Sequence, residues 1–151
     1  MRVWGPLRSI RFGGLLLWLA VVVAFVAFCA IGAIWFGPKT FYPVWARALG
    51  NTSEPGTIGL PMGVLYALTA IATFAQVLAT AVVIHVLAVA SGPVAPLGGA
   101  GVGFGLGICI AAAASLGHRL FSGQGVKVWL IEIGNDIVAL TAAGLIIGVF
   151  G

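Results

Sequence analysis

Charged residues are scarce in this chain. Its 151 residues include seven Lys or Arg and three Asp or Glu, which together make 7% of the sequence. A soluble globular domain has about a quarter charged residues. Hydrophobic residues make up 62% here, and the mean hydropathy is +1.21. A soluble domain is therefore excluded. The few basic residues only flank apolar runs, which also excludes a nucleic-acid-binding surface.

Cysteine and histidine are equally scarce, with two residues of each. Cys29 and Cys109 both lie inside apolar runs, so the sequence offers neither a disulfide framework nor the ligand spacing of a metal site. No nucleophile–base pair and no phosphate-binding loop stands out. We therefore expect no metal, no cofactor and no enzymatic activity.

Long apolar runs are abundant instead. Four of them occupy residues 14–37, 60–90, 96–121 and 128–151. About 20 residues of helix, at 1.5 Å each, cross a hydrocarbon layer of ~30 Å. The run at 15–23 does not alternate between apolar and polar residues as a barrel strand would. The sequence predicts a single all-α domain, a four-helix transmembrane bundle surrounded by a lipid bilayer.

The charges at the ends of the runs give no orientation. With four spans, both termini lie on one side of the membrane. Three basic residues fall on that side and four on the other: Arg2, Arg8 and Arg11 against Lys39, Arg47, Arg119 and Lys127. This small difference does not orient the chain by the positive-inside rule. We expect a multi-pass protein of the cell (inner) membrane with both termini on the same side.

The loop between the first two runs has a pattern of its own. Its apolar residues recur at helical spacing: Phe41, Val44, Trp45, Ala48 and Leu49. Thr40 can cap the start of such a helix, and Gly50 can end it. The pattern predicts a short interfacial amphipathic helix between the first and second transmembrane helices.

Small residues are densest in the third run, where they form two ridges at a spacing of four. One ridge contains Gly99, Gly103 and Gly107, and the other contains Gly101 and Gly105. Small residues let helix backbones approach closely in a membrane. Two ridges predict that the third helix is central and packs on more than one neighbour; a mobile, glycine-rich helix is the alternative. A shorter ridge, Gly144 and Gly148, could serve contact with a second subunit.

Polar side chains inside the runs are costly in lipid, so each one needs a partner or a role. In the second run they share one helical face: Tyr66, Thr69, Thr73, Gln76 and Thr80. In the fourth run Glu132, Asn135 and Asp136 lie within about 100° of one another. At 1.5 Å per residue, Asp136 lies roughly 13 Å deep, level with Gln76. We expect Asp136 to face Gln76 and the threonines.

This polar seam has two interpretations. In the functional one, Asp136 is a proton or cation site in a small oligomeric carrier or permeation protein for a proton-linked or cationic solute. In the structural one, Asp136 joins helices through hydrogen bonds of about 1 kcal/mol, and the protein is a non-catalytic accessory or scaffold subunit that packs through its glycine-rich faces. For Glu132 we favour a salt bridge to Arg119 or Lys127.

A motif at the end of the first run resembles a known family. Residues 32–45 read Gly-Ala-Ile-Trp-Phe-Gly-Pro-Lys-Thr-Phe-Tyr-Pro-Val-Trp. This resembles the signature Gly-x-x-Trp-Tyr-x-Pro, Phe-x-x-x-Trp and Gly of domain-of-unknown-function family 1761, small bacterial proteins with four predicted spans. Phe36 replaces the usual Tyr, and Tyr42 a usual Gly. The resemblance implies the four-span fold and no established activity.

The same motif has a physical interpretation. Pro38 cannot continue a helix, so it ends the first span at the membrane surface. Trp35, Phe41 and Trp45 would then anchor the amphipathic segment against the bundle. The final run, through Asp136 to Gly144, also resembles the last helix of the family, where Tyr-His often stands in place of Asn135-Asp136.

Overall fold

The computed structural model describes residues 5–50 and 60–150, with side chains from residue 14 onward. The side chains of Arg2, Arg8 and Arg11, whose side of the membrane was predicted above, lie outside this described part. Its elements are all helical in this part of the chain: α1 Gly5–Trp35, α2 Tyr42–Ala48, α3 Met62–Ser91, α4 Pro96–Leu106, the π-helical turn η1 Gly107–Ala112, α5 Ala113–Phe121 and α6 Gly125–Phe150.

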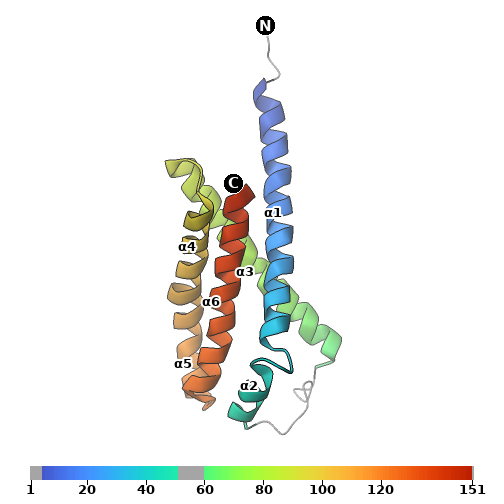
Figure 1. Cartoon of the computed structure of the whole chain (residues 1–151), viewed down its shortest axis with the longest axis vertical. Helices are drawn as coiled ribbons and strands as arrows, with labels where there is room; N and C mark the ends of the chain where they lie inside the picture. Colours follow the sequence, from blue (N-terminus) through green and yellow to red (C-terminus); the bar gives the residue numbers. More distant parts are fainter. Residues whose placement is uncertain (1–4, 51–59, 151) are drawn as a thin grey trace.

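Four helical stretches are long and apolar enough to cross a membrane: Gly14–Trp35, Met62–Ser91, Pro96–Phe121 and Gly125–Phe150. The third of these consists of α4, η1 and α5 joined without a break. The all-α, four-helix transmembrane bundle expected from the apolar runs is confirmed, and the chain is a membrane protein. In Figure 1 the short helix α2 lies at the same end of the bundle as the turn between α5 and α6, which we call the α2 end.

The helix at the centre of the bundle is α6, which contacts α1, α2, α3, α4, η1 and α5 (Figure 1). The prediction that the third span is central is wrong. That span packs mainly on α6, through one of its two glycine ridges. An apolar core fills the space between α1, α3 and α6, with Val21 and Ala24 from α1, Val77 and Ala81 from α3, and Ala143 from α6.

The contact between α4 and α6 is made by bare backbone. A Cβ on Gly99 would overlap the Gly144 carbonyl, and a Cβ on Gly103 would overlap the Leu140 carbonyl. At the start of η1, which continues α4, a Cβ on Gly107 would come 3.0 Å from the Ile137 Cα. Glycine at these positions therefore lets the two helices approach more closely than any side chain would allow.

Four glycines correct the sequence interpretation. Gly101 and Gly105 have open space where a Cβ would stand, so the second ridge packs on nothing in the described part of the chain. Gly144 faces Gly99, and a Cβ on Gly148 would come 3.0 Å from the Pro96 Cα. The ridge of Gly144 and Gly148, which could have served contact with a second subunit, packs inside the bundle instead.

Helix α3 leaves the bundle toward the α2 end. From Met62 to Ala72 no residue is buried, and Tyr66 is 67% exposed, whereas Thr73, Val77 and Thr80 are buried further along. Figure 1 shows α3 crossing the bundle obliquely, with its start far from α5. Only the second half of α3 thus belongs to the packed core.

The turn between α1 and α2 is closed by Thr40. Its hydroxyl lies 2.5 Å from the Ile34 carbonyl and 2.7 Å from the Trp35 carbonyl, so it caps the end of α1. We expected Thr40 to cap the start of α2, and this is wrong. Phe41 is the N-cap residue of α2, and no side-chain hydrogen bond caps that helix. Unsatisfied carbonyls at the end of α1 provide the acceptors.

Candidate functional site

Glu132 is the anchor of a polar cluster near the α2 end. Its Oε2 forms a salt bridge of 2.7 Å with Nε of Arg119, and the two side chains are 20% and 37% exposed. Its Oε1 accepts a hydrogen bond of 3.0 Å from the indole N–H of Trp45. Arg119 is one of the two cations that the sequence offered for Glu132. The charge of Glu132 is therefore neutralised, and the side chain connects α6 to α5 and α2.

Trp35 fixes the end of α1 against α6. Its indole N–H donates a hydrogen bond of 2.9 Å to the Ile131 carbonyl, and its ring stacks on Phe41 at a centroid distance of 4.5 Å. A Cβ on Gly134 would come 2.9 Å from the Trp35 ring. The absence of a side chain at Gly134 is therefore what admits the indole.

Trp45 fixes α2 in the same way. Besides its bond to Glu132, its ring meets Phe36 edge-on at 5.7 Å and lies 6.0 Å from Tyr42. The interfacial motif was expected to anchor the amphipathic segment against the bundle. The contacts of Trp35, Phe41 and Trp45 do this, and Pro38 lies in the turn between α1 and α2. The contacts are structural: each indole N–H has an acceptor on α6, as partly buried tryptophans require.

Asp136 lies one turn further along α6 and is half-buried. Its Oδ1 accepts a hydrogen bond of 3.3 Å from the amide of Asn135, and it has no ion-pair partner among the described residues. Asn135 is only 7% exposed, and its own Oδ1 has no hydrogen-bond partner there. This oxygen points toward α1, since a Cβ on Gly32 would come 3.8 Å from it.

The direction of Asp136 follows from the face of α6 on which it lies. Leu140 and Ala143 follow Asp136 at intervals of four and seven residues, and both belong to the core that α6 shares with α3. Asp136 continues this face toward the α2 end, where α3 has moved away. The carboxylate therefore points to the side of α3, and no neighbouring helix covers it fully.

The threonines of the predicted stripe make their hydrogen bonds within α3. Thr69 donates its hydroxyl to the Leu65 carbonyl and Thr80 donates to the Gln76 carbonyl, both at 2.9 Å and both within α3. In the described residues no hydrogen bond joins Asp136 to Gln76 or to any threonine of the stripe. The expectation that these groups serve as its partners is wrong: Thr69 and Thr80 bond to their own helix, and Gln76 Oε1 has no partner among the described residues.

Gln76 nevertheless has a side-chain oxygen that lacks a hydrogen-bond donor among the described residues. Its side chain is half-buried, and its Oε1 is fully buried without a partner in the described part of the chain. Thr73, one turn earlier, is buried on the same helical face. Two buried amide oxygens, on Gln76 of α3 and Asn135 of α6, thus remain without donors among the described residues. Buried acceptors of this kind usually bind water or a ligand.

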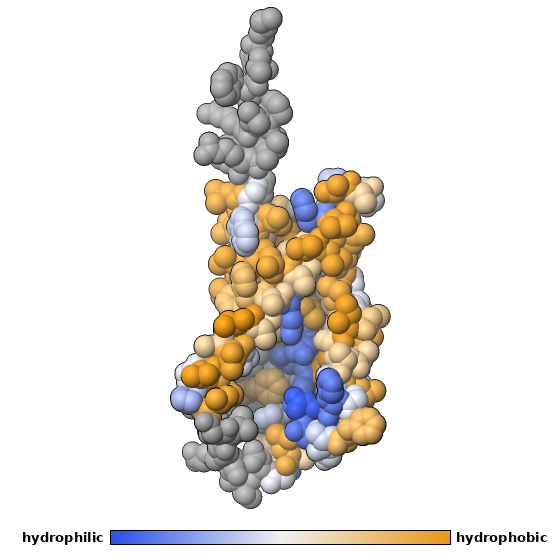
Figure 2. All heavy atoms as spheres, turned by 180° about the vertical axis from the view of Figure 1, so that it is seen from behind, coloured by the Kyte–Doolittle hydropathy of each residue, from blue (hydrophilic) through white to orange (hydrophobic). Residues whose placement is uncertain are grey.

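The far side of the bundle is hollowed where α3 diverges. Figure 2 shows hydrophilic surface gathered inside this hollow toward the α2 end, with hydrophobic surface on both flanks. The strongly polar side chains that the described helices carry at this depth come chiefly from α6 and α5, among them Asp136, Glu132 and Arg119. A polar hollow at membrane depth is unusual, because lipid chains cannot satisfy it.

Trp129 marks a feature that the sequence pattern did not single out. Its indole N–H lies 3.2 Å from Ser115 Oγ and 3.3 Å from the Ala112 carbonyl, at the end of η1. Ser115 in turn donates 2.8 Å to the Ala111 carbonyl. Carbonyl groups are poorly paired in a π-helical turn, and here Trp129 and Ser115 donate hydrogen bonds to the carbonyls at its end. The sequence could have indicated this contact, because the indole of Trp129 lies inside an apolar run and needs a hydrogen-bond acceptor there.

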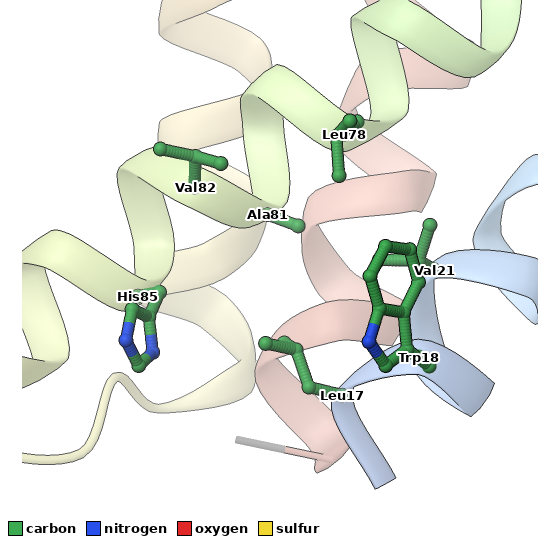
Figure 3. Close-up of a pocket in the computed structure, with 7 residues that line it drawn as sticks. All are labelled: Leu17, Trp18, Val21, Leu78, Ala81, Val82 and His85. Atoms are coloured by element: carbon green, nitrogen blue, oxygen red, sulfur yellow. The ribbon is translucent and has the colours of Figure 1, made fainter. Parts of the chain in front are cut away.

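A second concave region lies between α1 and α3, nearer the other end. It is a half-open pocket of about 100 Å³, lined by Leu17, Trp18, Val21, Leu78, Ala81, Val82 and His85 (Figure 3). The lining is apolar apart from the edges of His85 and Trp18, so the pocket offers no set of polar groups for chemistry. No cluster of three metal-binding side chains occurs among the described residues.

Comparison with known proteins gives one match. The model of a protein family described as a protein of unknown function (DUF1761) matches residues 19–148. No curated protein and no solved structure matches the chain. The matched range includes both the Trp35–Trp45 anchor and the polar residues of α6.

Proposed function

The chain belongs to the family of proteins of unknown function DUF1761, and on that premise we propose that it is a carrier or permeation protein without enzymatic activity. In this proposal a proton-linked or cationic solute moves past Asp136.

One observation carries the proposal: Asp136 is a carboxylate at membrane depth whose charge no described side chain balances. Glu132, the other acid of α6, is neutralised by Arg119 at 2.7 Å. The faces of α1, α3 and α4 that pack near Asp136 contribute only uncharged groups, such as Gln76 and Gly107. An acid in such a setting needs a proton or a cation, and intramembrane acids commonly serve ion and proton pathways.

The test is a flux measurement on the purified protein in liposomes. Methylammonium is the probe cation, and an enclosed pH-sensitive dye reports proton movement. We expect uptake that depends on the pH gradient in the wild type and falls at least tenfold in Asp136→Asn, which keeps the shape and hydrogen bonds of the side chain.

The matched control makes the same chemical change outside the four spans. The chain has three acidic side chains, Glu54, Glu132 and Asp136, and Glu54 stands between α2 and α3 in the sequence. Glu54→Gln should transport like the wild type. Equal uptake by Asp136→Asn and the wild type, with both proteins folded by their thermal transitions, would overturn the carrier proposal.

The alternative is a non-catalytic accessory or scaffold subunit, and one observation favours it. Gly101 and Gly105 leave a small-residue face of α4 open to another helix. In the carrier proposal this face joins copies of the chain into a homo-oligomer; in the alternative it binds another membrane protein. The mass of the detergent-solubilised Gly101→Leu, Gly105→Leu variant separates them: a wild-type oligomer that falls to a monomer supports the homo-oligomer.

A further inference from the structure

We propose that the hollow beside Asp136 binds an amphiphilic organic ammonium that enters sideways from the bilayer. This inference rests on the proposed function and narrows the solute from any cation to a class with a charged amine and an apolar portion.

The hollow is open at the side of the bundle (Figure 2). The Trp35 and Trp45 contacts close α1 and α2 against α6, whereas α3 is separated from α5 on the far side. Figure 2 views the bundle from its side, so the hollow in it faces the bilayer as well as the α2 end. A ligand dissolved in the membrane can therefore reach the hollow without crossing a packed helix interface.

Asp136 determines which charge the site favours. Asp136 is the unbalanced acid on the face of α6 that α3 leaves open, so the site favours a single positive charge. Gln76 Oε1 is an acceptor without a donor among the described residues, and so is Asn135 Oδ1. Asn135 uses its amide hydrogens on Asp136, which fixes its oxygen as the free end. Both oxygens are fully buried, and that of Asn135 points toward α1, so the carboxylate of Asp136 is the group that binds the ammonium.

The diverging half of α3 forms one wall of the hollow (Figure 2). Tyr66 and Thr69 lie on the same helical face of α3 as the buried Thr73, so in the diverging half of α3 they face the hollow. Tyr66 offers an aromatic ring to a cation. Met62 lies on the same face one turn before Tyr66, and this large apolar side chain is 36% exposed. A hydrated inorganic ion gains nothing from such walls, whereas an alkyl chain does.

The test uses chemical labelling of Asp136 in nanodiscs. The membrane-soluble reagent dicyclohexylcarbodiimide modifies carboxyl groups that face lipid, and a water-soluble carbodiimide modifies those that face water. Peptide mass spectrometry separates Asp136 from Glu54 and Glu132. We expect the membrane-soluble reagent to label Asp136 faster. Labelling by the water-soluble reagent alone would overturn lateral entry.

Protection from labelling then defines the ligand. Hexylammonium should protect Asp136 at a concentration at least tenfold lower than ethylammonium, and hexanol should not protect. Tyr66→Ala should raise the protecting concentration of hexylammonium several-fold, while Tyr66→Phe, which keeps the ring, should not. Equal protection by the two amines would overturn the amphiphile and leave the cation carrier intact.

Two further outcomes separate the remaining possibilities. Absence of protection by any amine, together with methylammonium flux that depends on Asp136, would overturn this inference but not the proposed function. Absence of both would overturn both. Comparing nanodiscs of phosphatidylethanolamine and phosphatidylcholine distinguishes the source of the amine: slower labelling in the first identifies a lipid headgroup, and equal labelling identifies a free amphiphile.

Discussion

The glycines of the third span have different roles, and the backbone opposite each of them decides which. Gly99 and Gly103 face carbonyl groups of α6, whereas Gly101 faces open space. The spacing of small residues predicts both ridges equally well. Which ridge is used depends on where the partner helix is equally bare, and Gly144 supplies that bare surface opposite Gly99. A pattern on one helix cannot contain this information.

A matched pair of alanine variants tests this assignment. Gly103→Ala should destabilise the protein by about 1–3 kcal/mol, because the methyl group enters the space of the Leu140 carbonyl. Gly101→Ala should be neutral, or stabilising by up to about 1 kcal/mol, because alanine favours the helix and meets no neighbour. Thermal unfolding in one detergent measures both. Equal transition temperatures for the two variants would contradict the α4–α6 packing.

The residues of the candidate site were predicted with mixed success for a similar reason. The depth of Glu132 indicated an ion pair, and Arg119 makes it. The partner of Trp45, however, is Glu132 itself, and the interfacial spacing of the tryptophan did not reveal it. Threonine hydroxyls can bond within their own helix or across to another. Periodicity places them on a face but does not choose between these partners.

At the scale of the helices, the tilt of α3 decides what the polar stripe does. Its face was predicted from the helical period, and Thr73 and Thr80 are indeed buried on it. Tyr66 and Thr69 share the face but are exposed, because the helix diverges from the bundle before Thr73. Tilt is set by packing against neighbours and is not encoded in the apolar length of a span.

Cysteine scanning along α3 tests this divergence. In a background with Cys29 and Cys109 replaced by alanine, single cysteines at 62–72 should react with a membrane-soluble maleimide at every helical position. Beyond Ala72 reactivity should follow the helical period, with protection at Thr73, Val77, Thr80 and Ile84, which are buried. A helical period of protection that extends through residues 62–72 would show that α3 packs along its whole length.

At the scale of the whole molecule, the number and character of the spans were predictable from apolar content, because the bilayer fixes the length of a crossing helix. The centre of the bundle was not. Glycine density indicated the third span, but α6 lies at the centre because it can present different residues to each neighbour: Gly144 to α4, Ile131 to Trp35 of α1, and Ala143 to the core shared with α3.

The four-span topology predicts that both ends of the chain lie on one side of the membrane. Figure 1 shows α6 ending at the end of the bundle from which α1 descends. Reporters fused before Met1 and after Gly151, active only in one compartment, should give the same result in the same cells. Opposite results would mean that one of the four helices does not cross.

The central position of α6 has a consequence for how the protein is assembled in the cell. The ribosome makes α6 after the other three spans, yet most of the core is formed on its surface. Until α6 is made, α3 can contact only α1 and α4, and the bare glycine backbone of α4 has no matching surface. The first three spans therefore remain loosely associated in the membrane until α6 is inserted. A nascent chain stalled before residue 125 should be far more sensitive to membrane proteases than one released after residue 150.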